Sequence, residues 1–166
     1  METAQLQMMT FHVPSNRGIL EVLGQIALRH GHLDHILRMT IKTPGEASVQ
    51  EARDGTCFEG SHVLRERIRK IARTQLGEET ALIKLQALLE RARRATEKRN
   101  ELIHNIWAQP LDGDPQIRTT DHHWKPIPTI DELNALEVEI AGITKELNDG
   151  RLNRFLSDAV DGKKRP

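Results

Sequence analysis

Hydrophobic side chains recur at three- and four-residue steps in four separate stretches of the chain, with polar residues between them. This spacing is typical of helices that bury one face and expose the other. It predicts helices over residues 18–41, 61–76, 78–107 and 130–147, the last continuing more weakly to residue 156. The first helix carries its apolar side chains at Ile19, Val22, Leu23, Ile26, Leu33, Ile36, Leu37 and Ile41.

Breaker residues and caps separate these stretches. Residues 43–60 begin with Thr-Pro-Gly, and we expect a loop there with at most one short helical turn. Pro110 is expected to end the third helix. Thr129 and Glu132 have the spacing of a capping box, in which the hydroxyl and the carboxylate bond to each other's backbone amides. We expect residues 161–166 to form a disordered tail.

The segment between the third and fourth helices, residues 109–127, has a different character. Asp112-Gly113 is a hairpin turn signal, and the residues after it alternate as in a short strand. We therefore expect a small β-hairpin inserted between these helices. The fold class predicted from these elements is all-α: a single domain over residues 1–166, built as a four-helix up-and-down bundle with that hairpin insert.

The composition excludes several classes of protein. The chain has 166 residues, enough to bury a core without metals or disulfides. Its single cysteine, Cys57, excludes a disulfide framework, has no nearby charged partner, and is interpreted as structural. No apolar run approaches the roughly 18 residues needed to cross a bilayer, and the first residues lack the pattern of a signal peptide. We expect a cytoplasmic protein with no membrane partner.

The formal net charge of zero conceals two opposed blocks. Residues 61–99 carry 11 basic and 5 acidic side chains, a net charge of +6. Residues 100–150 carry 3 basic and 10 acidic side chains, a net charge of −7. Because the charges are segregated in this way, a local basic surface that faces an anionic partner such as RNA is compatible with overall neutrality.

One motif lies where these two blocks meet. Arg99 is followed directly by Asn100 and, after three further residues, by His104. All three lie within the predicted third helix. This pattern resembles the R-x4-6-H signature of the HEPN family, in the form that has a polar residue after the arginine. The position of the motif in the second half of a long helix, before a turn-rich segment, is similar to the family as well.

The resemblance implies a HEPN-like bundle and a metal-independent endoribonuclease that works as a homodimer and needs no cofactor. It implies that His104 is the general acid or base at a ribose 2′-hydroxyl, that Arg99 stabilises phosphate charge, and that Asn100 orients these groups. A toxin or defence effector controlled by an antitoxin or another regulatory protein would match such an activity. Toxins of one HEPN branch carry a modifiable Tyr two residues after the His, but this chain has Ile106 there and no Tyr at all.

The proposed chemistry is also reasonable from the residues alone. An imidazole has an ordinary pKa near 6.5 and exchanges protons readily at cellular pH. A guanidinium offers a fixed charge and a planar set of donors for phosphate oxygens, and RNA supplies its own nucleophile. Five residues along a helix separate two side chains by roughly 140°. From this angle we expect Arg99 and His104 of one copy to point to different places. Two copies related by a two-fold axis could bring an Arg of one helix near a His of the other, which is a reason to expect a homodimer.

Further residues are candidates for substrate binding. Arg94, Lys98 and Arg69 could form a phosphate-attracting rim, and Trp107 could stack on a base. Each also has a simpler interpretation, as ordinary charged surface or as packing at the bundle end. The alternative function is a non-catalytic HEPN-like module that binds RNA or nucleotides or mediates dimerisation. A third possibility is a helical adaptor in which Arg99 and His104 are incidental.

The remaining histidines give weaker signals. His30, His32 and His35 lie close together in sequence, but His30 and His32 are roughly 200° apart on a helix and no further ligands complete a tetrahedron. We therefore predict no metal site and interpret these three as ordinary helix residues. His122 and His123 lie in the predicted hairpin. They are either solvated loop residues or contacts to a substrate.

Overall fold

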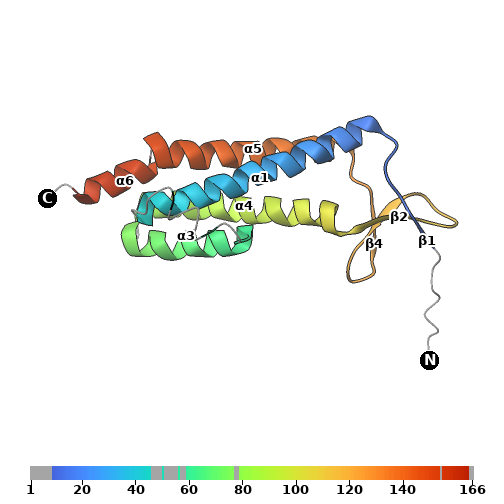
Figure 1. The fold of residues 1–166 in the computed structure, drawn as a ribbon, viewed down its shortest axis with the longest axis horizontal. Coiled ribbons are helices and arrows are strands. Elements are labelled where there is room, and N and C mark those ends of the chain that lie inside the picture. The colour runs from blue at the N-terminus through green and yellow to red at the C-terminus, as the bar shows by residue number, and fades with distance from the viewer. Residues whose placement is uncertain are drawn as a thin grey trace, which may run out of the picture.

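The protein is mostly helical, with a small antiparallel β-sheet at one end of the helices (Figure 1). The structure is a computed structural model, and it describes residues 9–45, 50, 56, 59–76, 79–153 and 155–164. Cys57 and most of the predicted loop 43–60 lie outside the described residues. The helices are α1 (Arg17–Gly45), α3 (Ser61–Leu76), α4 (Thr80–His104), α5 (Ile130–Asn153) and α6 (Phe155–Lys164), and the strands are β1 (Met9–Phe11), β2 (Ile106–Pro110), β3 (Gln116–Arg118) and β4 (Trp124–Pro126).

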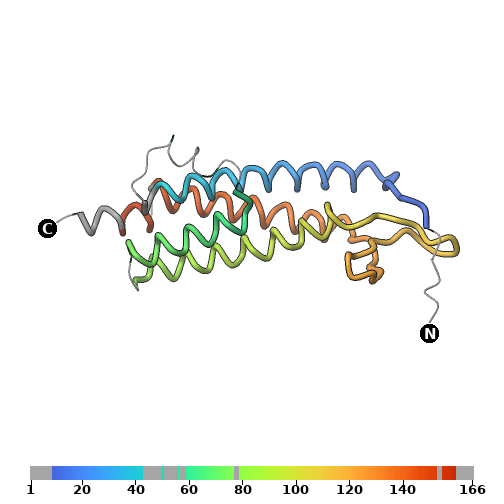
Figure 2. The backbone as a smooth tube through the Cα atoms, turned by 60° about the horizontal axis from the view of Figure 1, so that its bottom comes forward, coloured from blue at the N-terminus to red at the C-terminus, as the bar shows by residue number. Residues whose placement is uncertain are grey.

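The long helices pack lengthwise around one apolar core (Figures 1 and 2). Most side chains that supply this core recur at three- and four-residue steps, so the predicted helical faces are buried for most of their length, although Val63 and Ile103, which share the spacing, are exposed. None of the described helices has an apolar stretch long enough to cross a membrane. The largest fully buried side chains are Ile26, Leu33, Leu37, Leu64, Ile68, Leu76, Leu85, Leu89, Leu133, Ile140, Ile143 and Leu147.

Helices α1 and α5 run in the same direction, which contradicts the predicted up-and-down order. The start of α1 lies beside the start of α5, where the backbone of Gly18 faces the Cδ1 atom of Ile130. Further along both helices, Arg29 Nε donates to Glu137 Oε1 over 2.7 Å. Helix α3 also runs in this direction (Figure 2), and only α4 among the four long helices is antiparallel to the others.

Helix α3 begins beside α1 well before the end of α1. The hydroxyl of Ser61, the first residue of α3, donates to the Asp34 carboxylate. Asp34 lies 11 residues before Gly45, the end of α1, which corresponds to roughly 16 Å along a helix. The start of α3 therefore lies roughly 16 Å back along α1 from its end. Periodicity specifies which face of a helix is buried but carries no information about its direction, so the sequence pattern could not predict this arrangement.

Helix α4 ends at His104, three residues earlier than predicted, and Pro110 is not the residue that ends it. Asn105 has an extended backbone, and the chain passes directly into β2. The indole N–H of Trp107 donates to the backbone carbonyl of Leu102 over 2.7 Å. This bond satisfies one of the carbonyls that a helix end leaves without an intrahelical partner.

The predicted hairpin is present, but it belongs to a larger sheet with the strand order β1-β2-β3-β4. Its turn is closed by a bond from the Gly113 N–H to the Pro110 carbonyl over 3.3 Å, next to the predicted Asp112-Gly113 signal. Strand β1 was not predicted, because three residues are too few to show an alternating pattern. It forms by pairing with β2 from far along the chain, with Phe11 opposite Ala108.

Helix α5 begins as its capping box predicts. The Thr129 backbone N–H donates to Glu132 Oε2 over 2.8 Å, and the Glu132 N–H donates to Thr129 Oγ1 over 3.2 Å. Beyond α5, helix α6 continues to Lys164, whereas residues 161–164 were predicted to be disordered. Buried Leu156 anchors α6 to the core, which the weak periodicity of this segment only partly indicates.

Candidate functional site

Arg99, Asn100 and His104 come together at the end of α4, where the helix meets the sheet. Arg99 Nη1 donates to Asn100 Oδ1 over 3.0 Å and lies 3.3 Å from His104 Nε2. The expectation that Arg99 and His104 of one copy point to different places is therefore wrong. The angle of roughly 140° describes where the Cβ atoms point, but the long side chain of an arginine crosses that interval at a helix end.

A hydrogen bond from Arg99 to His104 requires one state of the imidazole. A guanidinium has only donors and stays charged, so it bonds to His104 only through an unprotonated Nε2. The neutral ring then carries its proton on Nδ1. In this tautomer Nε2 has the lone pair that a general base requires, and it is held beside a fixed positive charge.

Two adjoining cavities open onto His104. The larger, of about 580 Å³, lies between the polar face of α4 and the segment between β3 and β4, and the smaller has a volume of about 190 Å³. His104, the last residue of α4, thus borders both open spaces where the helix meets the sheet. The larger cavity is lined by Glu97, Asn100, Glu101, His104, Asn105, Thr119, Thr120, Asp121 and Lys125, and the smaller by His104, Asn105, Ile106, Arg118, Thr119, Thr120 and His122.

A buried polar network lies behind Arg99, between α1, α3 and α4. His30 Nε2 is 3.1 Å from Thr96 Oγ1, and Arg65 Nη1 donates to the same hydroxyl over 3.3 Å. His30 Nδ1 is 3.5 Å from Asp34 Oδ2. Sequence patterns gave no signal for this network, because its members come from three helices. It places a rigid polar layer in the core close to Arg99.

Burial lowers the pKa of His30, and the charges of Arg99 and Arg65 lower it further, while Asp34 opposes them. The folded protein therefore binds this proton less readily than the unfolded chain. The contribution of His30 to stability is present above the ordinary imidazole pKa, near 6.5, and is lost as the pH falls below it.

We expect the free energy of unfolding to fall between about pH 7.5 and about pH 5.5, above the range in which ordinary carboxylates titrate. Urea denaturation across this range measures the slope. The variant His30→Gln should have a smaller slope than the wild type, and His32→Gln, an exposed neighbour on the same helix, should keep the wild-type slope. Equal slopes in His30→Gln and the wild type would show that His30 does not cause the effect.

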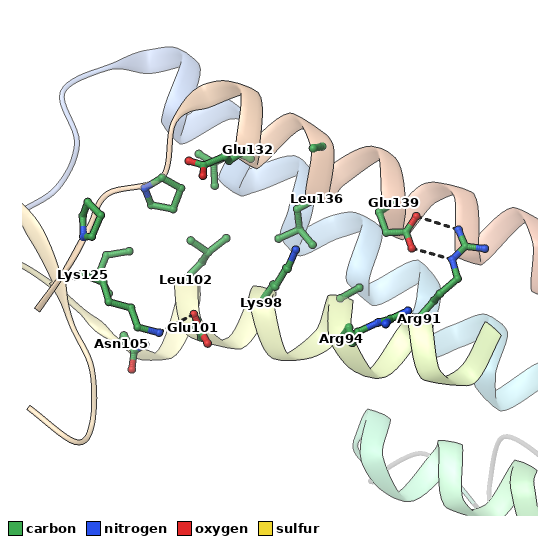
Figure 3. A pocket seen from close by; sticks show the side chains of 16 residues that line it. Arg91, Arg94, Lys98, Glu101, Leu102, Asn105, Lys125, Glu132, Leu136 and Glu139 are labelled. Atoms are coloured by element: carbon green, nitrogen blue, oxygen red, sulfur yellow. Dashed lines mark hydrogen bonds and ion pairs between the residues drawn. The ribbon is translucent and has the colours of Figure 1, made fainter. Parts of the chain in front are cut away.

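A cleft of about 640 Å³ between α4 and α5 holds two of the predicted substrate-binding residues (Figure 3). Arg94 and Lys98 project from one face of α4, and Lys98 extends towards Leu136 of α5. Neither cation makes a hydrogen bond or an ion pair with the described residues. Glu101, Asn105 and Lys125 line both this cleft and the 580 Å³ cavity at His104, so the two spaces adjoin.

Other cations of the basic block are neutralised by carboxylates. Arg91 binds Glu139 through two bonds of 2.9 Å, and Arg93 pairs with Glu90 and Glu97. The pKa of Glu139 is lowered mainly by its hydrogen bonds from Arg91. The net charge of +6 therefore overstates the basic surface, while Arg94 and Lys98 at the α4–α5 cleft keep charges that no ion pair with the described residues neutralises.

The other two predicted substrate-binding residues lie elsewhere. Arg69, on α3, is held by Glu66 and Glu90, and Glu90 lies 14 residues before His104 on α4. That interval is roughly 21 Å along a helix. Trp107 is half-buried, bonded to Leu102, and lines an apolar groove that does not include His104. The charge pattern suggested Arg69 and the aromatic ring suggested Trp107, but the structure does not bring them to the Arg99–His104 site.

The histidines of α1 do not form a metal centre with their neighbours. His30 is buried in the polar network, whereas His32 and His35 are exposed. Within the part of the chain that the structure describes, no three His, Cys, Asp or Glu side chains gather closely enough to hold a metal ion.

Comparisons of the chain with protein-family models, with curated proteins and with solved structures found no match.

Proposed function

We propose that this protein is a metal-independent endoribonuclease of HEPN type that acts on cytoplasmic RNA without a cofactor. The observation that carries the proposal is the 3.3 Å contact between Arg99 Nη1 and His104 Nε2, with Asn100 bonded to the same guanidinium nitrogen. The motif is at the end of a long helix and beside open cavities, as a site for a polymeric substrate requires. In this proposal α1, α3, α4 and α5 form a HEPN-like four-helix bundle.

The roles follow from the chemistry of the three side chains. His104 Nε2 takes the proton of a ribose 2′-hydroxyl, and the 2′-oxygen attacks the adjacent phosphorus. Arg99 moves from the imidazole to the phosphate, where its charge stabilises the added negative charge of the transition state. Asn100 holds Arg99 in place. The bond from phosphorus to the 5′-oxygen breaks, leaving a 2′,3′-cyclic phosphate and a 5′-hydroxyl.

The proposal includes a homodimer, supported by an apolar patch beside His104. Phe11 is 83% exposed, Val13 74%, and Ile103 and Ile106 each 40%. Ile103 directly precedes His104, and all four side chains line one groove. Apolar patches of this kind mark association surfaces, and a second copy on the patch would bring the two sites near each other. A toxin or defence role, restrained by an antitoxin or regulatory protein, is part of the same proposal.

A non-catalytic module that binds RNA or nucleotides is the alternative function. The unpaired Arg94 and Lys98 at the α4–α5 cleft favour it, because they attract phosphate groups whether or not cleavage follows. In this alternative, Arg94→Ala and Lys98→Ala weaken RNA binding while no RNA is cut.

Incubation of the purified protein with a short single-stranded RNA in excess EDTA tests the proposal. We expect cleavage that the chelator does not inhibit, with products that carry a 2′,3′-cyclic phosphate and a 5′-hydroxyl, identified by mass spectrometry. DNA of the same sequence is the matched control and should remain intact, since it lacks the 2′-hydroxyl. Absence of cleavage, or complete inhibition by EDTA, would contradict the proposal, and binding without cleavage would favour the alternative.

A further inference from the structure

The turn between β3 and β4 brings a second histidine to the cavity at His104. His122 lines the 190 Å³ cavity together with His104 and Arg118. The cavity is large enough for a phosphodiester group. Two imidazoles and a guanidinium, from α4 on one side and from the sheet on the other, thus border one small space. From the sequence alone, His122 could be either a solvated loop residue or a substrate contact.

The backbone of His122 has a φ of 67°, and it is the one non-glycine residue with a positive φ among the described residues. This left-handed conformation favours glycine, because a Cβ atom crowds the following carbonyl. Strained conformations of this kind persist where the surroundings hold them, and they gather at functional sites. Because glycine would fit this turn without strain, a histidine here indicates that the side chain has a function.

The surroundings of His122 hold the turn firmly. The backbone N–H of His122 donates to the Thr119 carbonyl over 2.9 Å. The Thr119 backbone N–H donates to the His123 carbonyl over 2.8 Å, and the Thr119 hydroxyl accepts the His123 backbone N–H over 3.1 Å. Thr119 is buried, and its hydroxyl also bonds to the Asp121 carboxylate. These bonds fix the backbone of the turn that carries His122.

Arg118 supplies a fixed positive charge to the same cavity. Its guanidinium lies 5.7 Å from the centre of the Trp124 ring, and its Nη1 is 3.6 Å from the sulfur of Met9. Its buried Nε has no hydrogen-bond partner among the described residues. The aromatic and sulfur contacts position the side chain without neutralising it, so the charge is available to an anionic group in the cavity.

We propose that His122 is the general acid of the cleavage reaction, and that it works with His104 in the same chain. This inference rests on the proposed ribonuclease function. The 2′-hydroxyl proton passes to His104 Nε2 as the bond from the 2′-oxygen to phosphorus forms. The bond from phosphorus to the 5′-oxygen breaks with its electron pair on that oxygen, which takes a proton from the His122 imidazolium. Exchange with water restores both imidazoles.

A pair of substrates with different leaving groups tests this role. The 5′-oxygen of RNA needs a proton as it leaves, whereas 4-nitrophenolate leaves without one. We expect His122→Gly to slow cleavage of a dinucleotide such as UpA by about 10²-fold or more. The same variant should cleave uridine 3′-(4-nitrophenyl phosphate) within a few-fold of the wild-type rate. Glycine suits the positive φ, so this variant keeps the turn.

His123→Ala is the matched control, since His123 is exposed, adjacent in sequence and not part of the cavity lining. It should cleave both substrates at wild-type rates. Equal losses on both substrates in His122→Gly, or no loss on either, would overturn the role of His122. Cleavage that depends on His104 but not on His122 would remove this inference and leave the proposed function intact.

A binding experiment tests the shared cavity independently of turnover. Uridine 3′-monophosphate, titrated into the protein, should shift the NMR ring resonances of both His104 and His122, with those of His123 unchanged. If the nucleotide shifts neither ring, or shifts His104 alone, the shared cavity does not bind a phosphate between the two histidines and the proposal is wrong.

Discussion

Replacement of His104 with Ala is expected to slow RNA cleavage by about 10²- to 10⁴-fold, the range that a positioned general base contributes. Arg99→Ala should cost about 10²- to 10³-fold, since it removes one preorganised donor to the transition state. Arg99→Lys keeps the charge but not the planar set of donors, and we expect it to restore only part of the activity. Single-turnover cleavage of a labelled RNA measures all three.

The contact between Arg99 and His104 makes a further prediction for the double variant. Groups that act as one unit have non-additive effects, so Arg99→Ala combined with His104→Ala should be slower than His104→Ala by much less than the loss in Arg99→Ala alone. Arg93→Ala is the matched control, because Arg93 is on the same helix and is occupied by Glu90 and Glu97. Wild-type activity in either single variant at the site would contradict the assignment.

Leu33→Ala is expected to destabilise the protein by about 2–5 kcal/mol, the largest stability change that we predict. Leu33 is 0% exposed and is among the fully buried side chains of the core. Its truncation removes buried apolar surface and leaves a cavity between helices that cannot fully close. Urea denaturation monitored by circular dichroism measures the change in the free energy of unfolding.

Leu28→Ala is the control for this prediction, with the same substitution on the same helix. Leu28 is 70% exposed, and its truncation should change the free energy of unfolding by no more than about 0.5 kcal/mol. Similar losses in the two variants would mean that α1 does not bury the face described here. A small loss in Leu33→Ala alone would show that the surrounding helices repack around the missing side chain.

Local features of the fold could be predicted because they depend on neighbours in sequence. The helical period, the capping box of Thr129 and Glu132, and the turn at Asp112-Gly113 involve interactions over a few residues. Strand β1 could not be predicted, because it exists only through pairing with β2. The end of α4 was placed three residues too late for a related reason. Trp107 satisfies the helix end only once the sheet forms.

The candidate site was predicted in part. The motif located Arg99, Asn100 and His104, and the charge pattern located Arg94 and Lys98 on the same helix. The pattern also suggested Arg69, because a sequence shows charges but not the carboxylates that neutralise them in the fold. The buried contact of His30 with Thr96 and the presence of His122 at the His104 cavity could not be predicted from the sequence, since each joins separate elements.

The sequence by itself determined which residues form the helices, which faces they bury and where one Arg-Asn-His motif lies. These properties follow from the short-range geometry of a helix, in which positions three and four residues apart share a face. Only the tertiary structure decided that α1, α3 and α5 run parallel, that Arg99 reaches His104 within one chain, and which cations remain unpaired. Direction, side-chain reach and ion pairing depend on groups that are distant in sequence, and packing alone brings those groups together.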